Sequence, residues 1–526
     1  MNEFTPGEIY PLELTSIAMG GEALGRLEDM AVFVPNGVPG DKIEVRLTDV
    51  KKNYARGEIN RIIKPSPHRV EPPCPIFYQC GGCQLQQMTY EAQLVYKKKM
   101  AYDTIRHLGA IQNCRIQEIV EAPSPWYYRN KMQAVAASKL YLHSKKQSPY
   151  FGLYARKTHK VIKMEKCMIQ HPLTNQALNV VKEAMTKLQW PVYDEKGHTG
   201  LVRYLVSRVS SSRNELLLML VTTTDRAPNI SEFINIVTTK MPTIKGIVIN
   251  VNPKKGNVIL GPTCKAVWGE SALIEEIKRT KFQISPLSFF QVNPIQTGNL
   301  LEKVEEILQP GEKDIILDAY CGIGAISIYL AKKVRKVIGI EEVPHAKKDA
   351  LASAQLNDVK NFEFIQGQVE KELPRLYHQG QKIDKVVIDP PRKGCDPRVL
   401  DMLANMRVKT IAYVSCNPAT LARDVKILTE KGYSFEELVP LDMFPQTYHV
   451  ESVAKLTYGP KHKASLGQKQ EEIRPKETLP KGKPPCPHCQ MTSLAGDDVS
   501  DYYEEGELDF AQLTDPVNNN ENEERK

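Results

Sequence analysis

The hydrophobic and polar positions are most regular in the last third of the chain, between residues 314 and 457. Short apolar runs rich in β-branched residues alternate there with stretches in which apolar residues recur at helical spacing. This alternation is typical of an α/β unit, in which helices connect the strands of a mostly parallel sheet. The runs predict strands at residues 314–320, 336–340, 361–365, 385–388, 410–414, 436–444 and 449–457.

Polar residues follow several of these strands, at the sheet edge where open α/β proteins bind ligands. Gly322 and Gly324 come after the first strand and would let the backbone approach a bound molecule. Glu341 ends the second strand, about twenty residues later, where a carboxylate that binds a ribose is expected. Asp389 must lie at the end of the fourth strand, because the two prolines after it cannot continue a central strand.

Cys416 follows the fifth strand in the sequence SCNP, directly before a predicted helix start. A helix N-terminus lowers the pKa of a nearby thiol, so this position suits a nucleophilic cysteine. A buried structural cysteine is an equally good interpretation, since free cysteines are among the most buried residues. Position alone therefore leaves both interpretations open.

The first 64 residues have the shorter pattern of a small β-barrel. Alternating apolar and polar residues predict strands at 8–18, 30–34 and 41–50, with glycine-rich turns between them. From residue 42 to residue 69 there are eight Lys and Arg against three acidic residues, with Tyr54 among them. This composition suits contact with a nucleic-acid backbone and a stacked base. The stretches GGEALGR and VPGDKIEVR resemble a TRAM domain, an RNA-binding module with an OB-like barrel.

Three cysteines follow the barrel within ten residues of one another: Cys74, Cys80 and Cys83. They would make a three-point thiolate site, and Cys167 is the best candidate for a fourth ligand. Cysteine tetrads hold zinc or an iron–sulfur cluster. Three closely spaced ligands with one distant ligand favour the cluster, because structural zinc usually takes its ligands in pairs. Reduced cysteines without a metal are the alternative.

The chain of 526 residues is long enough for about three domains. We expect an RNA-binding barrel at 1–64, an α+β central domain at 65–281, a catalytic domain at 282–458, and a disordered tail at 459–526 that is basic and then acidic. An amphipathic helix with a basic face is predicted at 90–108. We expect this helix to pack on the catalytic domain.

The charge of the chain is uneven. The net charge is +8, yet residues 497–526 hold eleven acidic residues against two basic ones, which leaves +17 for the remainder. A basic body of this size suits a nucleic-acid partner, with a merely soluble basic surface as the alternative. Arg129 and Lys131 lie among aromatic residues in PWYYRNKMQ, which suits contact with RNA as well as it suits core packing.

The composition also bears on the compartment. The N-terminal residues lack the basic and apolar regions of a signal peptide, and the longest apolar run is too short to cross a bilayer. We therefore expect a cytoplasmic protein without a membrane partner. We also expect it to act as a monomer. Eleven cysteines fit a reducing compartment, where clustered cysteines bind metals or catalyse rather than form disulfides.

Six motifs together resemble the RNA uracil-5-methyltransferase family, and the resemblance covers about residues 5–456. They are FFQVN at 289–293, DAYCGIG at 318–324, GIEEV at 339–343, DPPRKG at 389–394, YVSCNPATLARD at 413–424 and DMFPQTYHVE at 442–451. The nearest group is the 23S rRNA methyltransferases that carry a TRAM domain. The resemblance implies a Rossmann-like catalytic domain with a seven-stranded sheet, S-adenosylmethionine as cofactor and 5-methyluridine as product. It also implies a 4Fe-4S cluster on Cys74, Cys80, Cys83 and Cys167.

Uracil methylation has a chemical need that these motifs can meet. Carbon 5 of uracil is too weak a nucleophile to attack a methyl sulfonium, but a thiolate that adds to carbon 6 produces a reactive enolate. Cys416 is the expected nucleophile. A base must then remove the carbon-5 proton so that the thiol can leave, and the resemblance places this role on Glu451. His449 is the rival base, because it lies two residues away and would share a strand face.

The resemblance extends to the cofactor. Gln291, Tyr320, Glu341 and Asp389 match the family's cofactor-binding positions, with Glu341 expected on the ribose hydroxyls. Tyr320 stands where Phe is common and should still pack on the cofactor. Asp389 is a candidate for contact with the uracil as well. The target base must leave its stack to reach Cys416, and an unpaired loop lowers the free energy that this requires.

Other functions stay open. An amino-group methyltransferase would favour an aromatic residue where Arg392 stands, and it would leave Cys416 and Glu451 without a role. A non-catalytic RNA-binding or RNA-folding factor would not need the intact catalytic motifs. Within the family, the alternative substrate is the tRNA T-loop uridine. The barrel and the cysteine cluster favour 23S rRNA, because the tRNA enzymes typically lack both.

Overall fold

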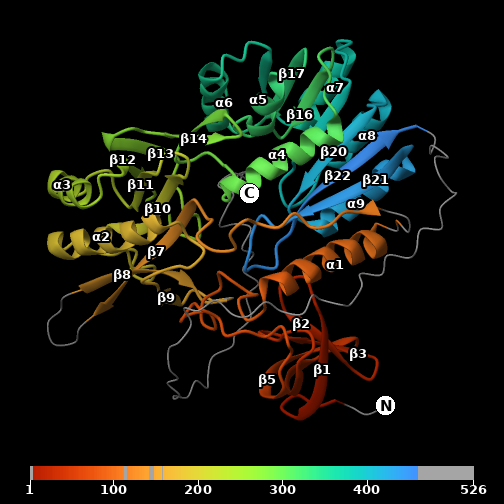
Figure 1. Ribbon diagram of the computed structural model, residues 1–526. Coiled ribbons are helices and arrows are strands. Elements are labelled where there is room, and N and C mark those ends of the chain that lie inside the picture. The colour runs from red at the N-terminus through yellow and green to blue at the C-terminus, as the bar shows by residue number, and fades with distance from the viewer. Residues whose placement is uncertain (1–3, 110, 112–114, 141–146, 157, 460–526) are drawn as a thin grey trace, which may run out of the picture.

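The computed structural model describes residues 4–109, 111, 115–140, 147–156 and 158–459. Within them the chain forms a barrel, a central sheet and a larger sheet with helices on both faces (Figure 1). The predicted disordered tail lies outside the described residues from 460 onward. In this described part of the chain, no helix combines the length and the apolar character needed to cross a membrane.

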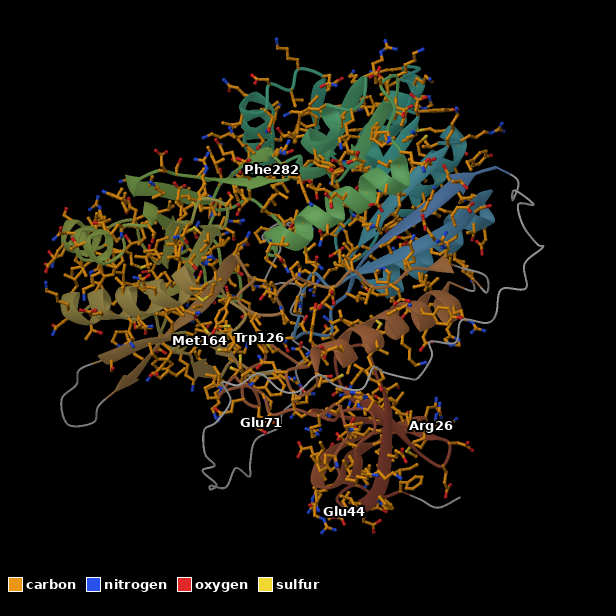
Figure 2. All side chains as sticks on the ribbon, in the orientation of Figure 1. Arg26, Glu44, Glu71, Trp126, Met164 and Phe282 are labelled. Atoms are coloured by element: carbon orange, nitrogen blue, oxygen red, sulfur yellow. The ribbon has the colours of Figure 1, made fainter. Side chains whose placement is uncertain are left out.

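Five strands close into the N-terminal barrel in the order β1-β2-β3-β5-β4. The strands are β1 (Ile9–Ile17), β2 (Ala23–Leu27), β3 (Met30–Val34), β4 (Lys42–Val50) and β5 (Tyr54–Lys64). Side chains alternate along β4, so that Ile43, Val45 and Leu47 are buried in the barrel core. Arg26 and Glu44 lie on the outside of the barrel (Figure 2). The prediction of a small barrel is confirmed.

A seven-stranded sheet forms the middle part of the chain, in the order β13-β12-β11-β10-β7-β8-β9. The strands are β7 (Lys131–Leu140), β8 (Gln147–Tyr154), β9 (Val161–Lys163), β10 (Val202–Ser210), β11 (Glu215–Thr222), β12 (Ile244–Val251) and β13 (Thr263–Gly269). Helices α2 (Pro172–Leu188) and α3 (Ile230–Lys240) lie together on one face (Figure 1). Trp190 stacks on Phe233 there, with ring centroids 4.7 Å apart.

A hairpin joins the central sheet to the catalytic domain. It consists of β14 (Leu273–Ile277) and β15 (Thr280–Ile284). Leu273 packs under the central sheet, whereas Phe282 packs into the core of the catalytic domain (Figure 2). The hairpin therefore contributes to both hydrophobic cores.

The larger sheet has the order β18-β17-β16-β19-β20-β22-β21-β6. Its strands are β16 (Ile315–Ala319), β17 (Lys336–Glu341), β18 (Phe362–Gln366), β19 (Lys385–Ile388), β20 (Thr410–Ser415), β21 (Tyr433–Leu441), β22 (Glu451–Tyr458) and β6 (Arg115–Ile116). The five strands from β16 to β20 run parallel, and β22 is antiparallel to both of its neighbours. The predicted methyltransferase-type sheet is present, but it has eight strands where seven were predicted. The additional strand is β6, which comes from outside the catalytic domain and pairs with β21.

Helices cover both faces of this sheet. They are α4 (Pro294–Leu308), α5 (Ala325–Ala331), α6 (Pro344–Leu356), α7 (Val369–His378), α8 (Pro397–Met406) and α9 (Pro418–Glu430). Helix α1 (Tyr90–Leu108) lies beside α9, between the barrel and the sheet (Figure 1). Ala101 and Ile105 of α1 share a core with Leu421 and Val425 of α9. The amphipathic pattern of α1 is therefore explained by packing on the catalytic domain.

A buried ion pair fixes α1 to the catalytic domain. Lys97 Nζ lies 2.6 Å from Asp442 Oδ1, and both side chains are almost completely buried. Lys97 also donates to the carbonyl of Phe444 at 3.0 Å. Burial lowers the pKa of Lys97, and the carboxylate of Asp442 opposes this effect. Removal of either partner would leave the other charge buried without compensation.

We predict that Lys97→Met lowers the free energy of unfolding by about 3–5 kcal/mol, because Asp442 loses its counter-charge while the side-chain volume is kept. Urea unfolding of the full chain, followed by circular dichroism, measures this loss. The double variant Lys97→Met/Asp442→Leu should recover most of it, since no buried charge remains. A single variant as stable as the unmodified protein would contradict the prediction.

Candidate active site

The register of two strands brings Cys416 and Glu451 together. In the antiparallel pairing of β20 with β22, Ser415 is opposite Ser452. The next step along both strands sets Cys416 opposite Glu451, and residues directly opposite each other project on the same side of a sheet. The Glu451 carboxyl group acts electrostatically on the Cys416 thiol, consistent with this register. Sequence reasoning selected both residues, and the structure places them side by side.

The pKa of the Cys416 thiol is raised by its surroundings. Its pKa is raised to about 12, first by burial and then by the negative charge of Glu451, while the nearby Arg392 acts in the opposite direction. Cys416 does precede a helix, because Asn417 caps α9 by accepting from the amide of Ala419 at 3.1 Å. Burial and the charge of Glu451 nevertheless raise the pKa of this thiol overall, whatever the helix start contributes.

Glu451 and His449 differ as candidate bases. Glu451 is 2% exposed, and burial together with Asp389 raises its pKa well above the usual value. His449 accepts a hydrogen bond at Nε2 from Arg392 at 3.4 Å. Burial and the charges of Arg392, Lys97 and Arg129 lower the pKa of His449 to about 3, so its imidazole is neutral at neutral pH. A histidine with so low a pKa is a weak base, which favours Glu451.

Arg392 is a site residue to which sequence reasoning gave no role. Its carbonyl accepts hydrogen bonds from Asn417 Nδ2 at 3.2 Å and from Thr420 Oγ1 at 3.3 Å, so the start of α9 holds the Arg392 loop. Its guanidinium group lowers the pKa of both Cys416 and Glu451. The sequence did contain a signal for this role, since Arg392 is a basic residue directly after the strand-ending Asp-Pro-Pro. Sequence reasoning noted only that an aromatic residue is lacking at this position.

The turn after β16 gives the backbone close access to the neighbouring carboxylate. Gly322 and Gly324 have φ angles of +54° and +77°, in the left-handed region that favours glycine. The amide of Gly322 donates to Glu341 at 3.0 Å, and the amide of Val343 donates to the other oxygen at 2.9 Å. A Cβ atom added at Gly322 would meet nothing within 4 Å. This side of the turn is therefore open to a ligand.

Several acidic groups gather around this turn. Burial raises the pKa of Asp318 to about 7, and burial together with Asp318 and Glu341 raises the pKa of Asp389 to about 7. Burial also raises the pKa of Glu341, which its two backbone donors oppose. Asp318 Oδ2 accepts from Ser327 at 2.6 Å, whereas Asp318 Oδ1 is buried without a partner within the described structure. A cationic ligand with hydroxyl groups would satisfy such a set.

The other two predicted cofactor residues lie on the flanks of this edge. The carbonyl of Gln291 accepts from Asn130 Nδ2 at 3.3 Å, which ties the segment before α4 to the central domain. Tyr320 has a φ of +64° and packs at the core that contains Cys395. Sequence reasoning missed Asp318, although it is the first residue of the DAYCGIG motif.

The four cysteines of the predicted cluster share one neighbourhood outside this site. Cys83 packs with Phe77 and Tyr128, and Cys74 and Cys167 contact the same group. Burial, together with Cys80 and Cys74, raises the pKa of Cys167 to about 11. Four mutually interacting thiols fit a thiolate site. As placed, however, no three Cys, His, Asp or Glu side chains among the described residues stand in a metal-binding arrangement, so the cluster stays a prediction.

Comparisons with known proteins agree with this geometry. Residues 270–458 match the model of the tRNA (uracil-5-)-methyltransferase family, and residues 3–59 match that of the TRAM domain. An uncharacterized RNA methyltransferase of Halalkalibacterium halodurans is 39% identical over 449 residues, which cover 85% of this chain and 97% of the relative. One from Clostridium tetani is 40% identical over 449 residues, with coverage of 85% and 96%.

The chain belongs to the RNA uracil-5-methyltransferase family. A solved structure supports the assignment: the Pyrococcus abyssi tRNA (uracil-54, C5)-methyltransferase in complex with S-adenosyl-L-homocysteine. It is 29% identical, has a TM-score of 0.68, and covers 85% of this chain and 100% of its own. The protein is thus an S-adenosylmethionine-dependent RNA methyltransferase that acts on carbon 5 of uracil, and the TRAM domain is an RNA-binding part of it.

Asp318, Glu341 and Asp389, here called the acidic edge, predict that the affinity of this methyltransferase for its cofactor depends on pH. S-adenosylmethionine carries a positive sulfonium, which favours the ionised forms of Asp389 and Asp318 and lowers their pKa below about 7. Binding then releases protons, so affinity increases from pH 6 to pH 8, by about tenfold for one proton coupled over one pH unit. Calorimetry in two buffers of different ionisation enthalpy measures the affinity and the number of protons released.

S-adenosylhomocysteine is the matched control for this prediction, because it lacks the sulfonium charge. Its affinity should vary less with pH than that of S-adenosylmethionine. Asp389→Asn should reduce the difference in pH dependence between the affinities of the two ligands. Equal pH dependence of the two ligands in the unmodified enzyme would contradict the role of the acidic edge.

Proposed function

We propose that this enzyme methylates carbon 5 of a specific uridine in 23S rRNA, with Cys416 as nucleophile and Glu451 as base. The observation that carries the proposal is the register of β20 and β22, which sets the Cys416 thiol opposite the Glu451 carboxyl group. Uracil-5 methylation needs a thiol and a base on the same face of the base, and this pairing supplies both.

The residues act in a fixed order. The Cys416 thiol gives its proton to water, and the thiolate adds to carbon 6 of uracil. The electron pair of the double bond between carbons 5 and 6 moves towards the carbonyl oxygen on carbon 4, which produces the enolate. Arg392 favours this step, because its charge stabilises both the thiolate and the negative charge that develops beside it. After carbon 5 has gained the methyl group, Glu451 removes the carbon-5 proton. The electron pair of that bond restores the ring double bond, and the bond from carbon 6 to the Cys416 sulfur breaks.

The acidic edge would hold the cofactor. Glu341 offers a carboxylate to the ribose hydroxyls, and Asp389 lies between the cofactor edge and Glu451. Gln291 and Tyr320 would complete the binding residues from the two flanks. When bound, S-adenosylmethionine supplies the electrophilic methyl group. Asp389 interacts with both Glu341 and Glu451, which supports a role in aligning cofactor and uracil.

We further propose that Cys74, Cys80, Cys83 and Cys167 hold a 4Fe-4S cluster. Their shared burial and mutual electrostatic effects support a thiolate site. When bound, the cluster would supply structure to the RNA-binding surface, since the reaction has no redox step. The sulfur of Cys80 already accepts one backbone hydrogen bond: the amide of Gly82 donates to Cys80 Sγ at 3.4 Å.

The RNA substrate has two candidates. The barrel and the cysteine site support 23S rRNA. The similarity to a tRNA enzyme favours tRNA as the second candidate, because an alignment over 85% of this chain extends well beyond residues 282–458. That solved enzyme therefore shares more than the catalytic domain with this protein, which weakens the argument from domain content.

We predict that the enzyme releases tritium from RNA labelled at uridine carbon 5, when given S-adenosylmethionine and unmodified 23S rRNA. Cys416→Ala should abolish release, because no adduct forms. Glu451→Gln should lower release by about 10²–10⁴-fold and leave a covalent protein–RNA complex visible on a denaturing gel. His449→Gln should lose much less, since the imidazole is already neutral.

Parallel reactions with unmodified tRNA decide the substrate. Release from rRNA alone supports the proposal, and release from tRNA alone overturns the substrate but keeps the mechanism. No release from either RNA, from enzyme that binds the cofactor, would contradict the mechanism and favour a role in RNA binding or folding.

We predict that the protein purified without oxygen contains iron and acid-labile sulfide in equal amounts, with the visible absorption of an iron–sulfur protein. Cys83→Ala should lose both, because one of four thiolate ligands is missing. Cys264→Ser is the matched control: Cys264 is exposed and lies elsewhere on β13, so its loss should leave the iron content unchanged. Zinc without sulfide in the unmodified protein would contradict the cluster.

A further inference from the structure

The loop of residues 442–450, here called the base loop, leads from β21 into Glu451 at the start of β22. It sets the path by which the chain enters β22, while the pairing of Glu451 with Leu441 fixes the place of Glu451 in the sheet. Hydrogen bonds from other parts of the chain hold this loop at several points. Asn293 Nδ2 donates to the carbonyl of Met443 at 3.2 Å, and the Tyr128 hydroxyl donates to the carbonyl of Pro445 at 3.0 Å.

Gln446 is the most constrained residue of the base loop. It is 2% exposed, and its φ of +69° lies in the left-handed region, which is costly for a residue with a side chain. This conformation aims its carbonyl at two consecutive amides, those of Gln84 and Leu85, both at 3.0 Å. These residues directly follow Cys83, so the cysteine-bearing segment contacts the base loop through the backbone.

Gln93 of α1 forms hydrogen bonds with the backbone amide and the side-chain oxygen of Gln446. Gln93 Oε1 accepts from the Gln446 backbone amide at 3.1 Å, and Gln93 Nε2 donates to Gln446 Oε1 at 3.0 Å. The same Nε2 donates to the carbonyls of Leu85 and Met88, each at 3.0 Å. Gln93 is 1% exposed. If its side chain were lost, water could replace these hydrogen bonds only where a cavity large enough to hold it remained. One amide group thus joins α1, the segment after the cysteines and the base loop.

We propose that Gln93 is a positioning residue for the base: it holds Gln446 in the left-handed conformation and thereby aims Glu451 at the uracil carbon-5 proton. This inference rests on the proposed role of Glu451. Gln93 touches neither Cys416 nor Glu451 in the hydrogen bonds and ion pairs of the described residues. It acts through the backbone of the base loop, in which Gln446 lies five residues before Glu451.

The two chemical steps respond differently to this support. Cys416 directly follows β20 and is held by the capped start of α9, which is not part of the base loop. The base loop reaches this region through the bond between His449 and Arg392. Loss of Gln93 leaves the buried Gln446 amide and side-chain oxygen without partners, and this strain is relieved by movement of the base loop. Adduct formation by Cys416 should therefore persist, while removal of the carbon-5 proton by Glu451 slows.

The test is Gln93→Met, which keeps the volume and helix propensity of Gln93 but removes its amide. We expect tritium release to fall by about 10²-fold, the effect of roughly 1 Å misplacement of a reacting group. A covalent protein–RNA complex should accumulate on denaturing gels, as for Glu451→Gln. The KM for RNA and for cofactor should stay close to those of the unmodified enzyme.

Gln87→Ala is the matched control. Gln87 is a buried glutamine of the same segment, but its Nε2 donates to the carbonyl of Gly37 in the barrel at 3.3 Å and not to the base loop. It should not make the complex accumulate. Gln446→Ala should act like Gln93→Met, and the double variant should be little worse than either, because both remove the same interaction. If Gln93→Met fails to fold, Gln446→Ala carries the test alone.

The outcomes separate this inference from the proposed function. No accumulated complex with Glu451→Gln would overturn the role of Glu451 and this inference with it. Accumulation with Glu451→Gln but not with Gln93→Met or Gln446→Ala would overturn only the positioning role. Equal slowing of adduct formation and tritium release in Gln93→Met would also overturn it, because it would indicate a general loss of structure.

Discussion

Burial of carboxyl groups beside one thiol is the constraint on which the rest of the structure depends. Glu451 is buried, and Cys416 and Asp389 beside it are partly buried. Glu451 and Asp389 raise the pKa of Cys416, and Asp389 raises the pKa of Glu451. Charged groups in such a place are stabilised only by fixed partners or by a ligand. Arg392 provides a fixed cation, and the cofactor provides a mobile one. A bound cation would therefore favour the ionised forms of these groups.

This constraint explains why the site needs so much support from distant segments. A carboxyl group whose ionisation depends on its neighbours has to be held to within a fraction of an ångström. The start of α9 holds the Arg392 loop, and the central domain holds the segment around Gln291. Helix α1 holds the base loop. The proposed catalytic residues lie on one sheet, but the residues that support them come from α9, α1 and the central domain.

The sequence allowed the prediction of those parts of the site that depend on local patterns. The strands, the positions of Glu341 and Asp389 at strand ends, and the closeness of Cys416 to Glu451 follow from hydrophobic periodicity and from motifs. What escaped prediction depends on long-range contacts. The β6 strand has only two residues and no periodicity to detect. The Gln93–Gln446 pair joins residues 353 positions apart, and the raised thiol pKa depends on burial that no local pattern specifies.

The pairing of β6 with β21 has a consequence for how the chain is made. Helix α1 and β6 leave the ribosome hundreds of residues before α9 and β21, which cover them in the finished protein. Until synthesis reaches the last strands, the apolar face of α1 and the edge of β6 have no partner. Such surfaces attract chaperones and other nascent chains. The α1 and β6 segments can therefore complete their packing only after α9 and β21 have been made.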